Sequence, residues 1–303
     1  MSENTTFQRE ITRFLPDISL KFQEPLSRHT SFRIGGAAQV MAFPRSEGEL
    51  AQLLRTAAQL SLPVRILGGG TNILAPDEGV SGLVICLKNA LIGHEDLGGG
   101  AIRVYAGETM TNAAIFAAEL GLSGLEFAHG IPGTVGGGVY MNAGAYGGEI
   151  RQVCTAVAVM DFAGNSRVLS GDEMEFCYRG SVLQRENAIV LYADFTLLPQ
   201  PKEEILDLMQ QLKAKRSASQ PLDKPSAGSA FKRPVGGYAA ALIDQAGLKG
   251  YQVGGAAISS KHAGFAVNLG GATAADVKSL LRQVSDRVFE QSGIRLEPEI
   301  RIW

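Results

Sequence analysis

Several features that mark particular classes of protein are missing from this chain of 303 residues. Its three cysteines, Cys86, Cys154 and Cys177, are odd in number and share no close spacing, which argues against a disulfide framework and against a metal site. No window approaches the ~20 uninterrupted apolar residues that a membrane span needs. The N-terminal residues 1–14 lack the apolar core of a signal peptide. The sequence therefore predicts a cytoplasmic protein with reduced cysteines and no metal.

The chain also lacks an excess of charge of either sign, because its formal net charge is −2. It has no basic face for nucleic acid and no polybasic signal for a membrane surface. Hydrophobic residues make up 45% of the sequence and charged residues 19%, as in an ordinary globular protein, and the length is sufficient for two domains. We expect small molecules as partners, and neither nucleic acid nor membrane.

Glycine is the residue type in excess, with 37 of 303 residues, or about 12% against a usual level of roughly 7%. One block, residues 68–70, follows the apolar run 64–67 and precedes Thr71 and Asn72. A longer block covers residues 130–138 and includes Thr134. Runs of glycine let backbone N–H groups crowd around a diphosphate, because no Cβ prevents close approach. Two such blocks suggest two walls of one extended nucleotide cofactor site.

Two common nucleotide sites do not fit these blocks. A P-loop needs a lysine directly after its glycines, and neither block has one. The dinucleotide fingerprint belongs on a turn from a strand into a helix, but residues 72–76 end in proline and cannot open a regular helix. For either block alone, a glycine-rich turn without a ligand remains an equal alternative. The pair of blocks favours phosphate binding.

The pattern of apolar residues and breakers predicts an α+β protein with two lobes. Before a break at residues 199–201 we expect helices over 46–61 and 109–120, strands over 64–67, 80–87, 101–106 and 188–198, and a hairpin over 153–169. After it we expect helices over 203–215, 238–246 and 273–293 and a strand over 264–269. The helix over 203–215 should bury a stripe made of Ile205, Leu208, Met209 and Leu212.

Six motifs in this order resemble the UDP-N-acetylenolpyruvoylglucosamine reductase family, in its shorter form. They are residues 30–36, residues 68–72, residues 130–136 with 142–147, residues 178–181, residues 228–234 and residues 296–301. The resemblance implies a FAD-binding domain of the vanillyl-alcohol-oxidase (PCMH) type with two α/β subdomains, followed by an α+β substrate-binding domain. It implies a segment over 1–27, a FAD-binding domain over 28–198 and a substrate-binding domain over 199–303.

The resemblance also implies a reaction in which NADPH reduces non-covalently bound FAD. The reduced flavin then reduces UDP-N-acetylglucosamine enolpyruvate to UDP-N-acetylmuramate, a peptidoglycan precursor. The residues that carry over as FAD contacts are Arg33, Gly68, Gly69, Gly70, Thr71, Asn72, Ile131, Pro132, Gly133, Thr134, Gly136, Gly137, Asn142, Gly144 and Ala145.

Three residues carry over from the family motifs as catalytic. Ser229 corresponds to the proton donor, Arg179 to the cation that binds the substrate carboxylate, and Glu299 to a residue that polarises the substrate or positions the donor. This chemistry needs a cation beside the carboxylate, where negative charge develops, and a positioned acid for the proton. Glu297 is the nearest rival of Glu299. Because the two lie two residues apart on a strand, we expect them to point to opposite faces, so that only one faces the flavin. The motif position favours Glu299.

A basic cluster of Lys215, Arg216, Lys232 and Arg233 is assigned to the UDP diphosphate. For Lys215 and Arg216, cations that merely solvate a helix end are an equal alternative. Many family members have asparagine where this chain has Arg233, which leaves the contact of that residue open. His29 and His129 flank glycine motifs, and we expect both to be structural.

Two other functions fit part of the sequence. An oxidase of the same fold would explain both glycine blocks but not Ser229, Arg179 and Glu299 in their motifs. A flavin-binding protein without catalysis would have no use for a proton donor. The sequence favours the reductase, and a monomer is the default expectation.

Overall fold

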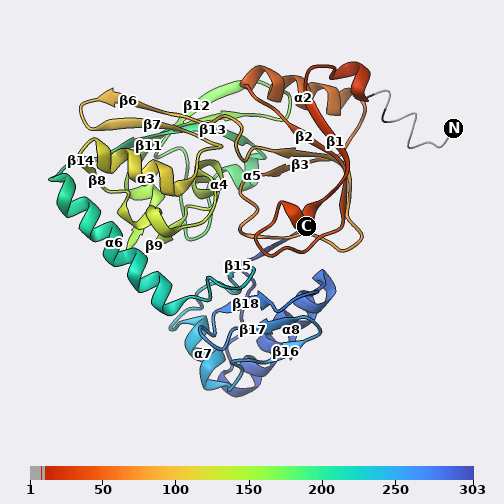
Figure 1. The fold of residues 1–303 in the computed structure, drawn as a ribbon, viewed down its shortest axis with the longest axis vertical. Helices are drawn as coiled ribbons and strands as arrows, with labels where there is room; N and C mark the ends of the chain where they lie inside the picture. The colour runs from red at the N-terminus through yellow and green to blue at the C-terminus, as the bar shows by residue number, and fades with distance from the viewer. Residues whose placement is uncertain (1–7, 9–10) are drawn as a thin grey trace. The chain divides into compact units, whose positions relative to one another are not determined.

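The structure, a computed structural model, describes Gln8 and residues 11–303 (Figure 1). Backbone proximity divides the chain into two compact units. Of the described residues, the first contains Gln8 and residues 11–23, 39–69 and 81–214, and the second contains residues 24–38, 70–80 and 215–303. Positions 1–7, 9 and 10 of the predicted N-terminal segment lie outside the described residues. The domain boundaries at 27/28 and 198/199 stay a prediction.

A four-stranded sheet with one covering helix forms the N-terminal layer. Its strands are β1 (Ser19–Pro25), β2 (Ala37–Phe43), β3 (Val64–Leu67) and β5 (Val80–Cys86), in the order β1-β2-β5-β3. Helix α2 (Glu47–Gln59) buries Leu50, Leu53 and Leu54 in a core shared with β2 and β5. Its N-cap is Ser46, whose side chain accepts from the N–H of Glu49 at 3.2 Å, and the Glu49 carboxylate accepts from the N–H of Arg45 at 2.7 Å.

An antiparallel five-stranded sheet forms the other part of the first unit, in the order β12-β11-β13-β7-β6. Its strands are β6 (His94–Gly98), β7 (Ala101–Tyr105), β11 (Cys154–Met160), β12 (Ser166–Ser170) and β13 (Ile189–Thr196). Helices α3 (Met110–Glu119), α4 (Val135–Tyr140) and the start of α6 (Lys202–Ser219) contribute to one core with it. Short elements complete the unit: β8 (Leu122–Ser123), η2 (Glu126–Gly130), β9 (Gly144–Ala145), β10 (Gly148–Glu149), η3 (Ile150–Gln152), α5 (Leu183–Glu186) and β14 (Leu198–Pro199).

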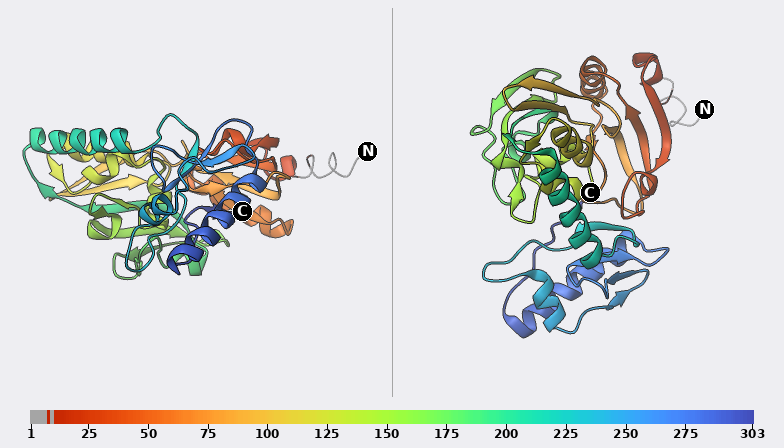
Figure 2. Two further views of the ribbon diagram at one scale, coloured as in Figure 1. Left: turned by 90° about the horizontal axis from the view of Figure 1, so that it is seen from below. Right: turned by 60° about the vertical axis from the view of Figure 1, so that its left-hand side comes forward.

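The second unit contains a four-stranded sheet in the order β15-β18-β17-β16, with antiparallel pairs. Its strands are β15 (Ser226–Ser229), β16 (Gln252–Val253), β17 (Ala256–Ile258) and β18 (Phe265–Asn268). Helices α7 (Ala239–Gln245) and α8 (Ala274–Ser292) share its core, and Figure 2 shows α8 alongside this sheet. Strand β4 (Ile73–Leu74) pairs in parallel with β19 (Arg301–Ile302), and η1 (Leu26–Arg28) precedes the first family motif.

The N-terminus of α8 is capped from two directions. Thr273 and Asp276 form a capping box, as their spacing allows. The Asp77 carboxylate, which follows β4, accepts from the N–H groups of Ala274 at 2.7 Å and Ala275 at 3.0 Å. These bonds satisfy N–H groups that have no partner within the helix, and they tie residues 70–80 to α8 within the second unit.

Most predicted elements are present within two or three residues of their expected ends, and Cys86 and Cys154 are buried thiols as expected. One predicted stripe was wrong, because Leu208 on α6 is 42% exposed while Ile205 and Met209 are buried. The buried face of helix α6 is therefore narrower than the sequence indicated, with Ile205 and Met209 in the core. Helix α4, inside the second glycine block, was not predicted.

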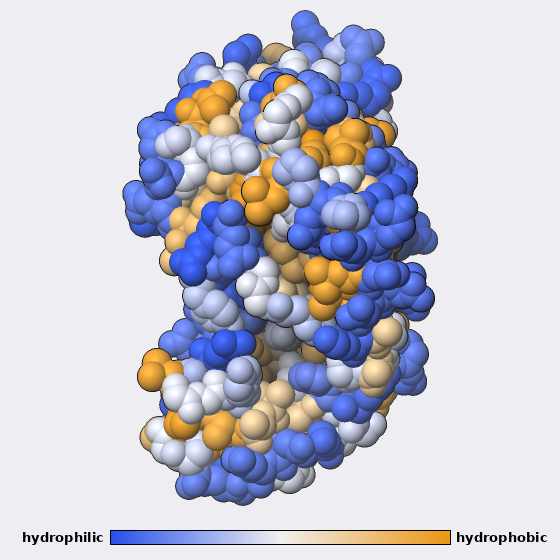
Figure 3. All heavy atoms as spheres, turned by 90° about the vertical axis from the view of Figure 1, so that its left-hand side faces the viewer, coloured by the Kyte–Doolittle hydropathy of each residue, from blue (hydrophilic) through white to orange (hydrophobic). Residues whose placement is uncertain are grey.

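Among the described residues, no helix is both long and apolar enough to cross a bilayer. Nor does the described part of the chain bring together three or more His, Cys, Asp or Glu side chains in a metal-binding group. On the face shown in Figure 3, apolar residues form small patches separated by hydrophilic ones. Scattered exposed apolar residues are normal for a protein surface.

Replacing Asp77 by alanine should lower the free energy of unfolding by about 1 kcal/mol, because two N–H groups of α8 lose their acceptor. Urea unfolding measures the change. The neighbouring exposed Glu78→Ala is the control and should stay within about 0.5 kcal/mol of the wild type. Equal effects of the two substitutions would contradict the capping role.

Candidate functional site

The two glycine blocks meet in the first unit. A Cβ on Gly69 would lie 2.8 Å from the Cα of Gly133, and a Cβ on Gly68 would lie 2.7 Å from the Oγ1 of Thr134. Neither distance is compatible with a side chain, so two backbone segments approach each other directly. Such a cradle presents backbone groups and one hydroxyl, which suits the diphosphate of FAD. The residues present therefore fit the cofactor implied by the sequence.

The second glycine block is partly helical. Thr134, 3% exposed, caps α4 by accepting from the N–H of Gly137 at 3.4 Å. A Cβ on Gly138 would lie 2.6 Å from the Sδ of Met110, and one on Gly136 would lie 3.0 Å from the Cβ of Ala106. Some of these glycines therefore serve the packing of α4 on α3 and β7. Glycine frequency alone could not separate this packing from a ligand-binding loop.

In the second unit, residues 70–72, at the end of the first glycine block, form hydrogen bonds with the family motifs 30–36 and 296–301. Gly70 (φ +64°) accepts from the N–H of Ser31 at 3.0 Å. The Asn72 side chain donates to the backbone oxygen of Glu299 at 3.3 Å, and the backbone oxygen of Asn72 accepts from the N–H of Arg301 at 3.0 Å. Residues 72–76 form β4 and a turn instead of a helix, which confirms the exclusion of the dinucleotide fingerprint. Thr71 is half-buried.

The remaining predicted FAD residues occupy loops. Ile131 is half-buried and Pro132 exposed, between η2 and α4. Gly144 and Ala145 form β9, the first strand of a hairpin whose two-residue loop has positive φ at both positions. Arg33 is exposed and has φ +56°. Their contacts with FAD stay a prediction.

Arg179 lies in a tight turn of the first unit. Cys177 and Gly180 exchange backbone hydrogen bonds of 3.0 and 3.1 Å, and Arg179 between them has φ +57°. The Nη1 of Arg179 donates to the backbone oxygen of Gly144 at 3.5 Å. A planar guanidinium placed on a turn is suited to bidentate contact with a carboxylate.

Ser229 lies at a β-bulge in the second unit. The register of β15 with β18 runs from Ser226–Val267 to Ser229–Phe265, so three steps on one strand match two on the other. Gly228 has φ +78°, which a side chain would disfavour. Bulges redirect a side chain and occur next to active sites. The bulge therefore gives Ser229 a direction that regular alternation would not.

Glu299 lies on the segment beside Ser229. The N–H of Glu299 donates to the oxygen of Ala230 at 2.9 Å, and the N–H of Lys232 donates to the oxygen of Glu297 at 2.9 Å. The structure thus brings the segments of Ser229 and Glu299 together within one unit.

The expectation that spacing allows only one of Glu297 and Glu299 to face the flavin was wrong in its reasoning, because residues two apart on a strand share a face. Their surroundings distinguish them instead. Glu297 is exposed and paired with Lys232 at 3.2 Å, while Glu299 is half-buried.

The four predicted diphosphate ligands have different surroundings. Lys215 is exposed and Arg216 half-buried near the end of α6. Lys232 is paired with Glu297, and the guanidinium of Arg233 lies 4.5 Å from the centre of the Tyr238 ring. All four belong to the second unit, but their role in binding diphosphate stays a prediction.

The two flanking histidines have different surroundings. His29 Nε2 lies 2.9 Å from Glu24 Oε1. Burial lowers the pKa of His129, and the charge of Lys213 lowers it further. Thr111 donates to the backbone oxygen of His129 at 2.9 Å.

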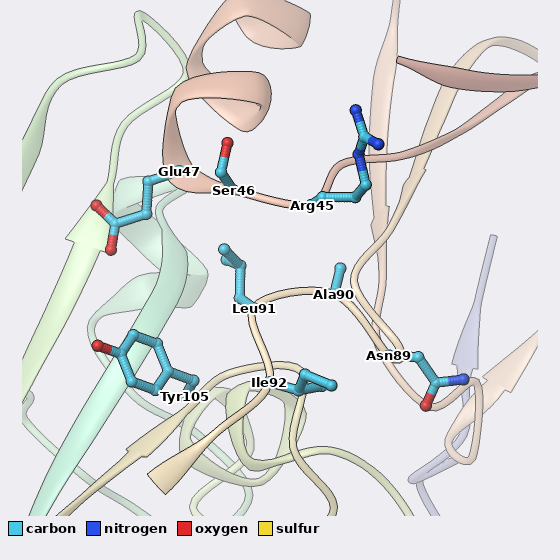
Figure 4. Close-up of a pocket in the computed structure, with 8 residues that line it drawn as sticks. All are labelled: Arg45, Ser46, Glu47, Asn89, Ala90, Leu91, Ile92 and Tyr105. Carbon is cyan, nitrogen blue, oxygen red and sulfur yellow. The ribbon is translucent and has the colours of Figure 1, made fainter. Parts of the chain in front are cut away.

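A surface cavity of about 470 Å³ lies elsewhere in the first unit, between the N-terminal end of α2 and the loop after β5. Figure 4 shows Leu91 and Tyr105 among its lining side chains. None of the predicted site residues lines it. We therefore do not assign the candidate site to this cavity.

Two supporting side chains were missed from the sequence. Gln184 donates to the backbone oxygen of Arg179 at 3.1 Å, and Ser181 donates to that of Tyr140 at 2.9 Å. Ser181 belongs to the family motif 178–181, so its position in that motif could have indicated a role in the site. Gln184, in a four-residue helix, gave none.

Replacing Gly69 by alanine should lower the free energy of unfolding by about 1–3 kcal/mol and reduce bound FAD, because the new Cβ would meet the backbone of Gly133. Melting curves and the ratio of flavin to protein absorbance measure both effects. Gly48→Ala, in the exposed first turn of α2, is the control and should stabilise by about 0.5–1 kcal/mol. Normal FAD content in Gly69→Ala would count against the cradle.

The lowered pKa of His129 predicts a pH dependence. The unfolded chain, with a histidine pKa near 6.5, takes up the proton first as pH falls, so the stability contributed by neutral His129 is complete above about pH 6.5 and lost below it. His129→Phe should therefore lose less stability than the wild type between about pH 7.5 and about pH 5.5 in urea unfolding. Identical pH profiles would contradict the assignment.

Two family models match the chain. The model described as UDP-N-acetylenolpyruvoylglucosamine reductase, C-terminal domain, matches residues 220–303, and the model described as FAD binding domain matches residues 38–170. The chain thus carries a FAD-binding domain of the vanillyl-alcohol-oxidase (PCMH) type and an α+β C-terminal domain.

Full-length relatives share the same name. UDP-N-acetylenolpyruvoylglucosamine reductase of Agathobacter rectalis is 44% identical over 99% of this chain and 98% of its own length. The protein of that name from Caldanaerobacter subterraneus is 45% identical over 97% and 96%.

The crystal structure of UDP-N-acetylenolpyruvylglucosamine reductase from Thermus caldophilus has a TM-score of 0.79 and 38% identity, over 94% of this chain and 98% of that one. A structure of alkyldihydroxyacetonephosphate synthase shares only the fold, with a TM-score of 0.50 and 17% identity over 64% of this chain and 40% of that one. The chain belongs to the UDP-N-acetylenolpyruvoylglucosamine reductase family, FAD-dependent oxidoreductases of peptidoglycan synthesis.

Proposed function

We propose that this chain reduces UDP-N-acetylglucosamine enolpyruvate to UDP-N-acetylmuramate with NADPH, using Ser229, Arg179 and Glu299. The observation that carries the residue assignment is the pairing of residues 230–232 with residues 297–299. This pairing supports the assignment, because residue 230 directly follows Ser229 and Glu299 belongs to the paired segment. The reaction requires an acid and a charged group at the same substrate.

The cradle of Gly68, Gly69, Gly133 and Thr134 would hold the diphosphate of FAD. When bound there, FAD would supply the hydride chemistry that links oxidation of NADPH to reduction of the enolpyruvyl double bond. Arg179 binds the substrate carboxylate through its guanidinium, because negative charge spreads onto that carboxylate as the hydride arrives. The same contact orients the double bond.

The hydroxyl of Ser229 gives a proton to the α-carbon of the substrate. A serine is a weak acid, so the resulting alkoxide needs a nearby cation, and Lys232 lies three residues further on. Its pairing with Glu297 keeps Lys232 near this segment. Glu299 polarises the substrate or positions the donor.

The sugar nucleotide extends the site. Lys215, Arg216, Lys232 and Arg233 provide cations of the second unit for the UDP diphosphate. Gly144, Ala145 and Arg33 complete the flavin site in this proposal. A cytoplasmic monomer is consistent with a water-soluble nucleotide substrate and with NADPH as reductant.

An anaerobic absorbance trace near the flavin band tests the function. NADPH should bleach the band, and UDP-N-acetylglucosamine enolpyruvate should restore it without oxygen. Recovery only after oxygen is admitted would favour an oxidase or a non-catalytic flavin protein. No flavin band after reconstitution with FAD would overturn the proposal.

Ser229→Ala should slow the recovery step by about 10²–10⁴-fold, because the proton donor is lost. Bleaching by NADPH should be unchanged, since no proton is delivered to the substrate in that step. Stopped-flow absorbance separates the two steps. Ser260→Ala, an exposed serine of the same unit, is the control, and an unaffected recovery in Ser229→Ala would refute the donor assignment.

A further inference from the structure

A buried side chain assigned to FAD from the sequence supports the turn that carries Arg179. We propose that Asn142 is a positioning residue for Arg179: its amide joins the turn 177–180 to the hairpin 144–149 and so fixes the guanidinium. This inference rests on the proposed role of Arg179 in binding the substrate carboxylate.

The side chain of Asn142 is fully engaged inside the protein. It is 1% exposed, and its Nδ2 donates to the backbone oxygen of Cys177 at 3.0 Å and to Glu149 Oε2 at 3.1 Å. Its Oδ1 accepts from the N–H of Arg151 at 3.0 Å. Both amide hydrogens and the amide oxygen therefore have protein partners. This commitment leaves the side chain better suited to supporting its neighbours than to binding a cofactor.

The bond to Cys177 acts on the turn itself. The same Cys177 oxygen accepts from the N–H of Gly180 at 3.1 Å, so Asn142 bonds the carbonyl that closes the turn. Arg179 lies within the turn at φ +57°, a conformation that costs a non-glycine residue free energy. A strained residue of this kind keeps its geometry only if its surroundings hold it.

The other end of the link is a rigid hairpin. A Cβ on Gly144 would lie 2.7 Å from the oxygen of Gly148, and a Cβ on Gly148 would lie 2.5 Å from the Phe127 ring. The close packing fixes the Gly144 oxygen, which accepts from Arg179 Nη1 at 3.5 Å. A shift of the turn relative to this hairpin would therefore move the guanidinium away from its acceptor.

Gln184 supports the turn from another direction. Its Nε2 lies 3.1 Å from the oxygen of Arg179 and 3.3 Å from the oxygen of Tyr140. This contact does not involve the hairpin. It gives an independent way to loosen Arg179.

An exchange of two groups removes the side-chain donor to Cys177, and Glu149→Gln alone reports the effect of losing the Glu149–Arg151 ion pair. The double variant is Asn142→Asp with Glu149→Gln. The amide introduced at position 149 can donate to the carboxylate introduced at position 142, but the Cys177 oxygen loses its side-chain donor. Aspartate also tolerates the φ of +42° at position 142. Glu149→Gln alone keeps both donors of Asn142. Asn89→Asp is the matched control, because Asn89 is exposed and has φ +63°.

The exchanged pair should slow the recovery of the flavin band by the enolpyruvyl sugar by about 10- to 100-fold and raise KM for the sugar. Bleaching by NADPH and FAD content should be unchanged. Adding Arg179→Ala to the exchanged pair should give the rate of Arg179→Ala alone, because both changes act through one group. Glu149→Gln and Asn89→Asp should recover at the wild-type rate within about two-fold.

A normal recovery rate in the exchanged pair would overturn the inference, and so would equal slowing of both half-reactions. It would also be overturned if the exchanged pair and Arg179→Ala slowed recovery by factors that multiply when the changes are combined. If the exchanged pair does not retain FAD, Gln184→Met is measured in the same way and must show the same non-additive loss. Normal recovery in Arg179→Ala itself would instead contradict the proposed role of Arg179.

Discussion

The direct approach of two backbone segments, Gly68–Gly69 and Gly133–Thr134, is the constraint on which the first unit depends. No side chain fits between them, so the elements that carry them must be held by packing elsewhere. Strand β3 is fixed by its parallel pairing with β5, and the 133–134 segment by the cap and packing of α4. Glycine loses more conformational entropy on folding than other residues. The packing of the two sheets that carry the cradle must therefore offset this entropic cost.

Four of the ten described non-glycine residues with positive φ lie in the family motifs. Arg33, Asn142, Tyr146 and Arg179 all have φ between +42° and +57°. Each such residue costs of order 1–3 kcal/mol and persists only where its neighbours over-determine it. Hydrogen bonds between Cys177 and Gly180 hold the turn that contains Arg179, and the pairing of β9 with β10 holds the two-residue loop that contains Tyr146. The strain is consistent with selection for the placement of side chains rather than for stability.

Local signals in the sequence predicted the capped helices well. Ser46, Thr109 and Thr273 each accept from the N–H three residues further on, as their positions indicated. Helix α4 escaped prediction because three of its six residues are glycine, which disfavours a helix unless packing compensates. The parallel pairing of β4 with β19 joins residues 73–74 to residues 301–302, and no local pattern could show it.

The identities of the candidate site residues were predictable from the motifs, but their arrangement was not. Only the structure shows that the segment of Glu299 lies beside the segment that follows Ser229. Residue spacing could not separate Glu297 from Glu299, whereas their partners and burial do. The engagement of Asn142 with Cys177 depends on residues 35 positions apart, so only the fold reveals it.

The central claim is that the glycine cradle holds a diphosphate, and comparing flavins tests it most directly. The flavin-free protein would be titrated with FAD and with riboflavin, which lacks phosphate, while flavin fluorescence is followed. If the cradle donates two hydrogen bonds to the charged diphosphate, FAD should bind at least about 100-fold more tightly than riboflavin. Equal dissociation constants for the two flavins would contradict the account.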